Sequence, residues 1–203
     1  MVQSITDLYT GALETTATTL HWALLYMVAY PDVQDKVRKE LEDVLGSSQT
    51  ISYEDRERLP FTNAVLHEIQ RLSKVIITSF RCCTRDTELH GFPIKKGAMT
   101  LFNIGSVLCD PKQWKNPQQF DPTNFLDDSG KFMNREAFLP FAAGVRVCLG
   151  EKLARTELFI FFVSLMRTFT FRLPEGVERI NTQPILGRIR SHPQSYRLCA
   201  VPC

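Results

Sequence analysis

The stretch that decides the fold is "FAAGVRVCLG", Phe141–Gly150, and the apolar helical pattern "EKLARTELFIFFVSLMRTF" follows it at once. Gly144 and Gly150 permit backbone geometry, or the close approach of a flat ligand, that a Cβ atom would prevent. Cys148 falls where the loop becomes the helix, and the positive end of a helix dipole stabilises a thiolate. Arg146 adds a fixed positive charge nearby. These residues predict a thiolate that can bind a metal without a second cysteine.

The alternative for this stretch is a buried core cysteine at a helix start, with two incidental turn glycines. The stretch is defined by five residues, Phe141, Gly144, Arg146, Cys148 and Gly150. At an average usage of ~5% for each of these residue types, a random chain of this length would contain the same spacing on the order of once in ten thousand. Chance is therefore the weaker explanation, and we favour the metal-binding thiolate.

The remaining cysteines show no pattern of their own. The chain has six cysteines, and they form no C-x-x-C pair and have no histidine at zinc-finger spacing. Apart from Cys148, we expect reduced, cytosol-facing thiols, some of them in the core. They are Cys82, Cys83, Cys109, Cys199 and Cys203.

Composition narrows the function classes. The 203 residues carry a net charge of +2, which is not the strongly basic charge typical of nucleic-acid-binding domains. No G-x-G-x-x-G phosphate loop marks a nucleotide site. The most apolar segments, "LHWALLYMVAY" and "LFIFFVSLM", fall short of the roughly 20 residues that cross a bilayer. Both are therefore predicted as buried helices.

Periodicity and turn residues predict a mainly α fold with small β-sheets. Helices are expected over residues 4–30, 31–45, 52–59, 60–73 and 151–169. Strands are expected over residues 75–80, within 87–104 with turns at His90-Gly91 and Lys96-Gly97, and in the tail from 171. The Pro- and Asp-rich residues 110–132 are expected to form an ordered loop over a core, because they carry Trp114, Phe120 and Phe125.

The deciding stretch resembles the haem-binding motif of the cytochrome P450 family, the haem-thiolate monooxygenases. "FAAGVRVCLG" matches F-x-x-G-x-R-x-C-x-G at every fixed position, including both glycines. The resemblance implies haem b, iron protoporphyrin IX, as cofactor, with Cys148 as the proximal iron ligand. It also implies that Arg146 binds a haem propionate and that Phe141 packs beside the thiolate, with Gly144 and Gly150 at the cofactor.

A second family mark is E-x-x-R on a helix, and here it is "EIQR", Glu68 to Arg71. Spacing i,i+3 places both side chains on one helix face. The resemblance implies a structural pair beside the haem loop, whereas the alternative is a surface ion pair of little worth. The family's P-x-R-F motif, in which His can replace the Arg, corresponds to "PTNF", where Asn124 brings a hydrogen-bonding amide without a charge.

The third mark lies in the first helix, where "GALET" resembles A-G-x-[DE]-T with its first two residues exchanged. The resemblance implies that Glu14 and Thr15 are catalytic and deliver protons to bound dioxygen. Gly11 and Ala12 would leave room for oxygen and substrate. The alternative is a core helix whose threonines bond back to their own turn.

Other positions are assigned by resemblance alone. Arg81, after the strand-like "VIITSF", would bind the other propionate, or else be a solvated arginine at a strand end. Apolar residues from two segments would line the substrate side, or else belong to the plain core. They are Val75, Ile76, Ile77, Ile185 and Leu186.

The wording of "DTELHGFPIKKG", "NPQQFDPTNFLDD" and "SYRLCAVP" resembles the vertebrate microsomal family 2 of these enzymes. The resemblance implies that residues 1–203 are the C-terminal portion of a P450 domain, from the oxygen-binding helix through the haem loop to the β tail, without the N-terminal membrane anchor. It also implies a location on the cytosolic face of the endoplasmic reticulum membrane.

The implied reaction inserts one atom of O2 into an apolar small molecule, such as a xenobiotic, a fatty acid or a steroid. Electrons would come from NADPH-cytochrome P450 reductase, with cytochrome b5 as a further candidate. Two alternatives stay open: a haem-thiolate isomerase or dehydratase, and a non-catalytic chain that binds a partner without haem. Basic residues near the thiolate would form a docking face for an acidic donor, or else an ordinary solvated face. They are Lys131, Arg135, Arg146, Lys152 and Arg155.

Overall fold

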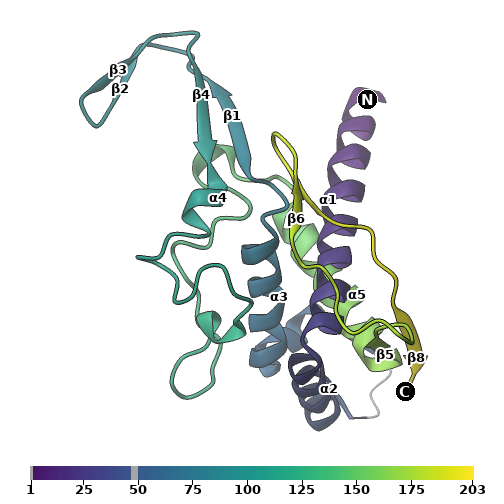
Figure 1. Ribbon diagram of the computed structural model, residues 1–203. Helices are drawn as coiled ribbons and strands as arrows, with labels where there is room; N and C mark the ends of the chain where they lie inside the picture. The colour runs from purple at the N-terminus through teal and green to yellow at the C-terminus, as the bar shows by residue number, and fades with distance from the viewer. Residues whose placement is uncertain (1, 47–49) are drawn as a thin grey trace.

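The computed structural model describes residues 2–46 and 50–203. Its body is a group of helices, with strands and a long irregular segment along their sides (Figure 1). The helices of the body are α1 (Val2–Ala29), α2 (Pro31–Leu45), α3 (Pro60–Ser73) and α5 (Glu151–Thr168). The shorter helices are η1 (Tyr53–Arg58), α4 (Ile104–Val107), η2 (Pro122–Phe125) and η3 (Gly144–Arg146).

Within the described residues, the strands form separate two-stranded antiparallel sheets. The pairs are β1 (Thr78–Cys82) with β4 (Met99–Asn103), β2 (Thr87–Leu89) with β3 (Phe92–Ile94), β5 (Phe169–Arg172) with β8 (Cys199–Pro202), and β6 (Pro184–Leu186) with β7 (Ser191–Pro193). The β2–β3 hairpin projects away from the helical body (Figure 1). The prediction of a mainly α fold with small sheets is confirmed.

Helix boundaries follow the proline and glycine residues of the sequence. Pro31 and Pro60 stand in the first turns of α2 and α3, where their missing N–H groups leave no helical bond unmade. Gly46 ends α2 with a positive φ of 50°, and its N–H donates to the Glu42 carbonyl. The Glu40 carboxylate accepts the first-turn N–H groups of α3 at 2.8 and 2.7 Å. A side chain of α2 therefore caps α3.

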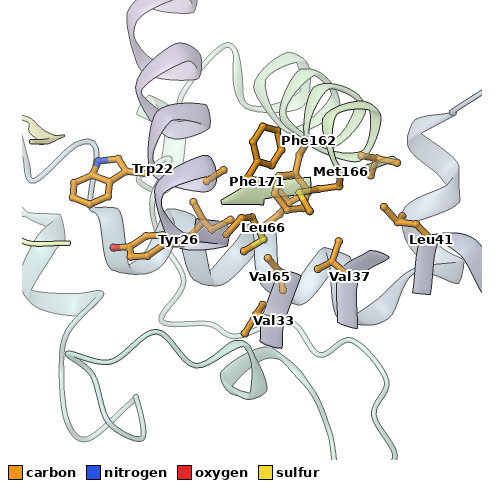
Figure 2. Packing of buried hydrophobic residues seen from close by; sticks show 14 of the residues in the cluster. Trp22, Tyr26, Val33, Val37, Leu41, Val65, Leu66, Phe162, Met166 and Phe171 are labelled. Atoms are coloured by element: carbon orange, nitrogen blue, oxygen red, sulfur yellow. The ribbon is translucent and has the colours of Figure 1, made fainter. Parts of the chain in front are cut away.

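The main hydrophobic core lies where the C-terminal half of α1 meets α2, α3 and α5. Figure 2 shows Val65 and Leu66 of α3 together with Phe162 and Met166 of α5, and Tyr26 and Trp22 of α1 to one side of them. The first half of α1 differs, because large apolar side chains stay exposed there. They are Val2, Ile5, Leu8, Tyr9 and Leu13. None of the described helices is both apolar enough and long enough to cross a membrane.

The Glu68–Arg71 pair is fully buried. All five N–H groups of the Arg71 guanidinium donate hydrogen bonds, two of them to the Glu68 carboxylate at 2.6 and 2.7 Å. The others reach the carbonyls of Leu108, Pro117 and Gln119. The alternative of a surface ion pair is thereby excluded.

The same pair holds the irregular segment of residues 110–132 against α3. Glu68 accepts the Asp121 N–H at 2.9 Å and the Asn124 amide at 3.3 Å. Burial raises the pKa of Glu68, while the donors around it oppose that shift. Trp114 and Phe125 are buried, and Phe120 joins the main core. The segment is therefore an ordered layer over a core, as the sequence predicted.

Some local expectations were wrong. No cysteine lies in the core, because the described structure leaves all six free and at least partly exposed. The strand expected from residue 75 begins at Thr78, since residues 75–77 bond instead to residues 189–191 of the tail. The short helix α4 was missed, and the Asn103 side chain caps it by accepting the Ser106 N–H at 3.1 Å.

Replacing Arg71 by alanine should lower the free energy of unfolding by about 3–5 kcal/mol, because it leaves the Glu68 charge buried without its partner. Urea unfolding measures this loss. The matched control is Arg58→Ala, which removes another i,i+3 pair whose arginine is 59% exposed, and which should cost less than about 1 kcal/mol. Equal losses for the two variants would contradict the assignment.

Candidate functional site

A cavity of about 640 Å³ opens between α1, the segment after α3, the loop of Phe141–Gly150 and the start of α5. This volume lies within the roughly 300–1,000 Å³ of small-molecule and cofactor sites. The wall from α1 is a stripe with helical spacing, which explains why one helix face serves the site. Its members are Ser4, Asp7, Leu8, Gly11, Ala12, Thr15, Thr16 and Thr19.

The loop at the cavity is closed by its own backbone. The Cys148 N–H donates to the Phe141 carbonyl at 3.0 Å, and the Cys148 carbonyl accepts the Glu151 N–H at 3.3 Å. Gly144 has a positive φ of 75°, so the motif needs a glycine at this point. Ala142 also has a positive φ, 62°, although it carries a Cβ atom. The loop thus presents the Cys148 side chain, which is exposed, at the cavity wall.

Gly150 plays a different part from Gly144. Its φ is −88°, which any residue adopts, so backbone conformation does not require glycine there. It stands immediately before α5, lines the cavity, and faces open space where a Cβ atom would stand. We expected Gly150 to provide either special backbone geometry or room for a close ligand. The structure supports only the room for a ligand.

Two guanidinium groups share the cavity wall with Cys148. Arg81 and Arg146 both line it, and Arg81 Nη2 donates to the Arg146 carbonyl at 3.3 Å. Arg81 Nη1 also donates to the Phe80 carbonyl at 2.7 Å. The structure therefore brings together one thiol and two fixed cations, which suit a ligand with carboxylates.

Glu14 and Thr15, the acid and the alcohol of "GALET", lie in different surroundings. Thr15 lines the cavity, and its hydroxyl donates to the Gly11 carbonyl at 2.7 Å, the back-bonded arrangement that the sequence left as an alternative. Glu14 lies outside the cavity wall and forms an ion pair with Arg190 beside β7. The hydrogen bond from Arg190 lowers the pKa of Glu14, so its carboxylate is ionised at neutral pH.

Only some of the apolar residues proposed for the substrate side line the cavity. Val75 and Ile76 line the cavity, together with Gly11 and Ala12. Ile77 lies outside the wall, with its side chain against Gly105. Ile185 and Leu186 stand in β6, more than half exposed and away from the cavity.

Sequence reasoning missed several wall residues. Leu149 stands just before α5, and Leu153 and Leu158 continue the wall along that helix. The four-residue step from Leu149 to Leu153 was a usable signal. Gln70 of α3 gave no such signal. It is 7% exposed, and its Oε1 has no hydrogen-bond partner among the described residues. Gln70 can therefore accept a hydrogen bond from a bound molecule or a water.

The chemistry of the donor set fits a haem. In the described residues, no group of three or more His, Cys, Asp or Glu side chains could hold a metal ion. A metal at Cys148 would need its other ligands from a cofactor, as the porphyrin of haem provides. The apolar wall, the two guanidinium groups and the open space at Gly150 suit a flat apolar ring with carboxylate tails.

Comparison with known proteins shows the family of this chain. The family model described as Cytochrome P450 matches residues 1–200. The chain belongs to the cytochrome P450 family. It is 49% identical over 203 residues to "Cytochrome P450 2J2" of Homo sapiens and 46% identical over 203 residues to "Cytochrome P450 2J5" of Mus musculus. It is also 46% identical over 204 residues to "Cytochrome P450 2K1" of Oncorhynchus mykiss.

These alignments cover 99–100% of this P450 chain but 40% of each relative. The chain thus spans about two fifths of the length of the curated relatives it matches. The resemblance to the vertebrate family 2 enzymes is confirmed along the whole chain.

The basic residues expected to form a docking face are not all free. Arg155 turns inward, because its guanidinium bonds to Glu151 and to His67. Arg135 donates to the Gln113 carbonyl at 2.6 Å and stacks over Trp114. Lys131 and Lys152 are exposed, and Arg146 belongs to the cavity wall.

Burial, and then the nearby Arg155 charge, lower the pKa of His67 to about 3. An unfolded chain takes up this proton near pH 6.5, so His67 contributes stability above pH 6.5 that is lost as the pH falls toward 3. We expect His67→Gln to reduce the slope of unfolding free energy against pH between 6 and 4 by up to about 1.4 kcal/mol per pH unit. Urea unfolding of both proteins at several pH values measures this, and parallel curves would contradict it.

Proposed function

We propose that residues 1–203 form the C-terminal portion of a haem-thiolate monooxygenase, from the oxygen-binding helix through the haem loop to the β tail. The observation that carries this proposal is the presence of Cys148, two guanidinium groups and the small-residue face of α1 on one cavity wall. Bound haem b would supply a redox-active iron that activates O2. The remaining chemistry belongs to side chains of this chain.

The loop of Phe141–Gly150 would hold the haem iron. Cys148 provides the thiolate ligand, and its backbone N–H is occupied by the Phe141 carbonyl. Arg81 and Arg146 would bind the propionates as charge-assisted donors. The Phe141 ring packs beside the thiolate and helps to exclude water.

Proton handling belongs to α1. The Thr15 hydroxyl stands at the cavity wall, where its oxygen can accept a hydrogen bond while its proton is donated to the Gly11 carbonyl. Glu14, ionised and exposed, exchanges protons with solvent beside Arg190. The Thr15 hydroxyl at the cavity wall favours a monooxygenase over an isomerase or dehydratase, since a reaction without dioxygen needs no side chain there to handle protons.

The substrate would be an apolar small molecule, such as a xenobiotic, a fatty acid or a steroid, because Val75, Ile76 and Ala12 line the cavity. Electrons would come from NADPH-cytochrome P450 reductase, with cytochrome b5 as a second donor. The exposed Lys131 and Lys152 are suited to dock an acidic donor. Family resemblance supports a location of the protein on the cytosolic face of the endoplasmic reticulum membrane.

A second candidate is a partner-binding chain without haem. The exposed apolar side chains along the first half of α1 favour it, because contiguous apolar surface marks interaction sites. The two candidates differ in whether the chain takes up haem through Cys148.

Haem added to the purified chain, or to a full-length protein containing it, should give the red-shifted Soret band of a thiolate complex after reduction and CO binding. Cys148→Ser should abolish this band, whereas Cys199→Ser, which changes another exposed thiol, in β8, should leave it unchanged. With reductase, the band should accompany NADPH-dependent oxidation of an apolar substrate. No haem uptake, or the same spectrum after Cys148→Ser, would favour the partner-binding candidate.

Arg81→Gln and Arg146→Gln should each weaken haem binding by about tenfold or more, because each removes a charge-assisted hydrogen bond to a carboxylate. Titration of the apoprotein with haem measures the dissociation constants. Arg85→Gln removes the same charge from an exposed residue outside the cavity and is the matched control. Equal affinity for all these proteins would contradict the propionate assignment.

A further inference from the structure

His67 of α3 is a half-buried polar residue that neither lines the cavity nor touches the proposed haem ligands. Its ring lies among phenylalanine side chains, with ring centroids 5.5 Å from Phe125, 4.6 Å from Phe132 and 5.0 Å from Phe138. Those aromatics come from the ordered segment and from the residues that lead into the thiolate loop. His67 therefore stands at the junction between α3 and the approach to Cys148.

Both ring nitrogens of His67 have partners, and one partner fixes the tautomer. Nδ1 lies 2.8 Å from the Asn63 carbonyl, and Nε2 lies 3.0 Å from Arg155 Nη1. A guanidinium can only donate, so Nε2 must accept and the proton must sit on Nδ1. His67 is thus a neutral imidazole that offers one acceptor to α5.

Arg155 is the link between His67 and the loop. Its Nε and Nη2 both lie 2.9 Å from Glu151 Oε1, while Nη1 reaches His67. Its planar face lies over the Phe141 ring, with 4.9 Å between the guanidinium carbon and the ring centroid. Hydrogen bonds at the edges of the guanidinium therefore set the tilt of the plane on which Phe141 rests.

Phe141 carries this orientation to the thiolate. Its ring lines the cavity, and its carbonyl accepts the Cys148 N–H at 3.0 Å. We propose that His67 is a positioning residue of the thiolate loop, which holds Arg155 in the orientation that supports Phe141 and, through it, the backbone of Cys148. The consequence for iron ligation rests on the proposed function, whereas the effect on the loop does not.

The first test therefore reads the loop without haem. In the apoprotein, His67→Phe keeps an aromatic ring but removes the acceptor, and hydrogen exchange at the Cys148 amide should become about tenfold faster or more, as loss of a hydrogen bond to a charged group implies. His67→Gln restores an acceptor and should bring exchange back to within about threefold of the wild type. Val65→Ala, a cavity-forming change in the same helix but facing the main core, should not accelerate this amide selectively.

Should His67→Phe fail to fold, Arg155→Lys gives a second route, because lysine keeps the charge but loses the planar fork and the stacking face. It should produce the same faster exchange at Cys148. Unchanged exchange in these variants, or equal acceleration in Val65→Ala, would overturn the proposal.

The second test reads the haem-loaded protein. His67→Phe should shift the reduction potential and the CO-bound Soret band, and His67→Gln should restore both. A chain that binds no haem yet shows faster loop exchange would contradict the proposed function and leave the positioning role intact. A loop that does not respond, in a chain that binds haem normally, would contradict the positioning role alone.

Discussion

The buried hydrogen-bonded pair of Glu68 and Arg71 is the constraint on which the rest depends. A guanidinium removed from water must have every donor satisfied, and Arg71 meets that demand with its carboxylate partner and three backbone carbonyls from outside α3. Those carbonyls lie in a stretch with little regular structure, which is thereby held on α3. The same stretch leads to the aromatics around His67 and then to Cys148, so the charge pair sets the path by which the thiolate reaches the cavity.

The cavity combines two kinds of wall. One is a helix face whose small and polar residues leave space, and the other is a loop whose backbone closes on itself between Phe141 and Cys148. Positive φ at Gly144 and Ala142 turns this loop sharply before α5 begins. At Ala142, which carries a Cβ atom, such geometry is held by neighbours rather than by local preference, and the Arg155 guanidinium over the Phe141 ring is one of those neighbours.

Much of this architecture was predictable from the sequence, because the decisive signals are local. Pro31, Gly46 and Pro60 mark helix boundaries by their own backbone chemistry, and the spacing of the cysteine motif marks the loop. The side-chain partners were less accessible. Arg155 looked like a surface cation, yet it turns inward because His67, 88 residues earlier, offers an acceptor. Ile185 and Leu186 looked like cavity residues, but the tail places them in an exposed strand. Only tertiary packing decides such cases.

The uneven burial of α1 has a consequence for the order of events in assembly. Its second half is locked into the core, whereas its first turns carry bare apolar side chains and few buried contacts among the described residues. A helix end of this kind unfolds locally at little cost in free energy. Thr15 lies at the boundary between these halves. A surface that covered the first turns would therefore also narrow the cavity beside Thr15. The α1 wall of the cavity would then be completed, and the Thr15 hydroxyl would be fixed in place, in one cooperative step.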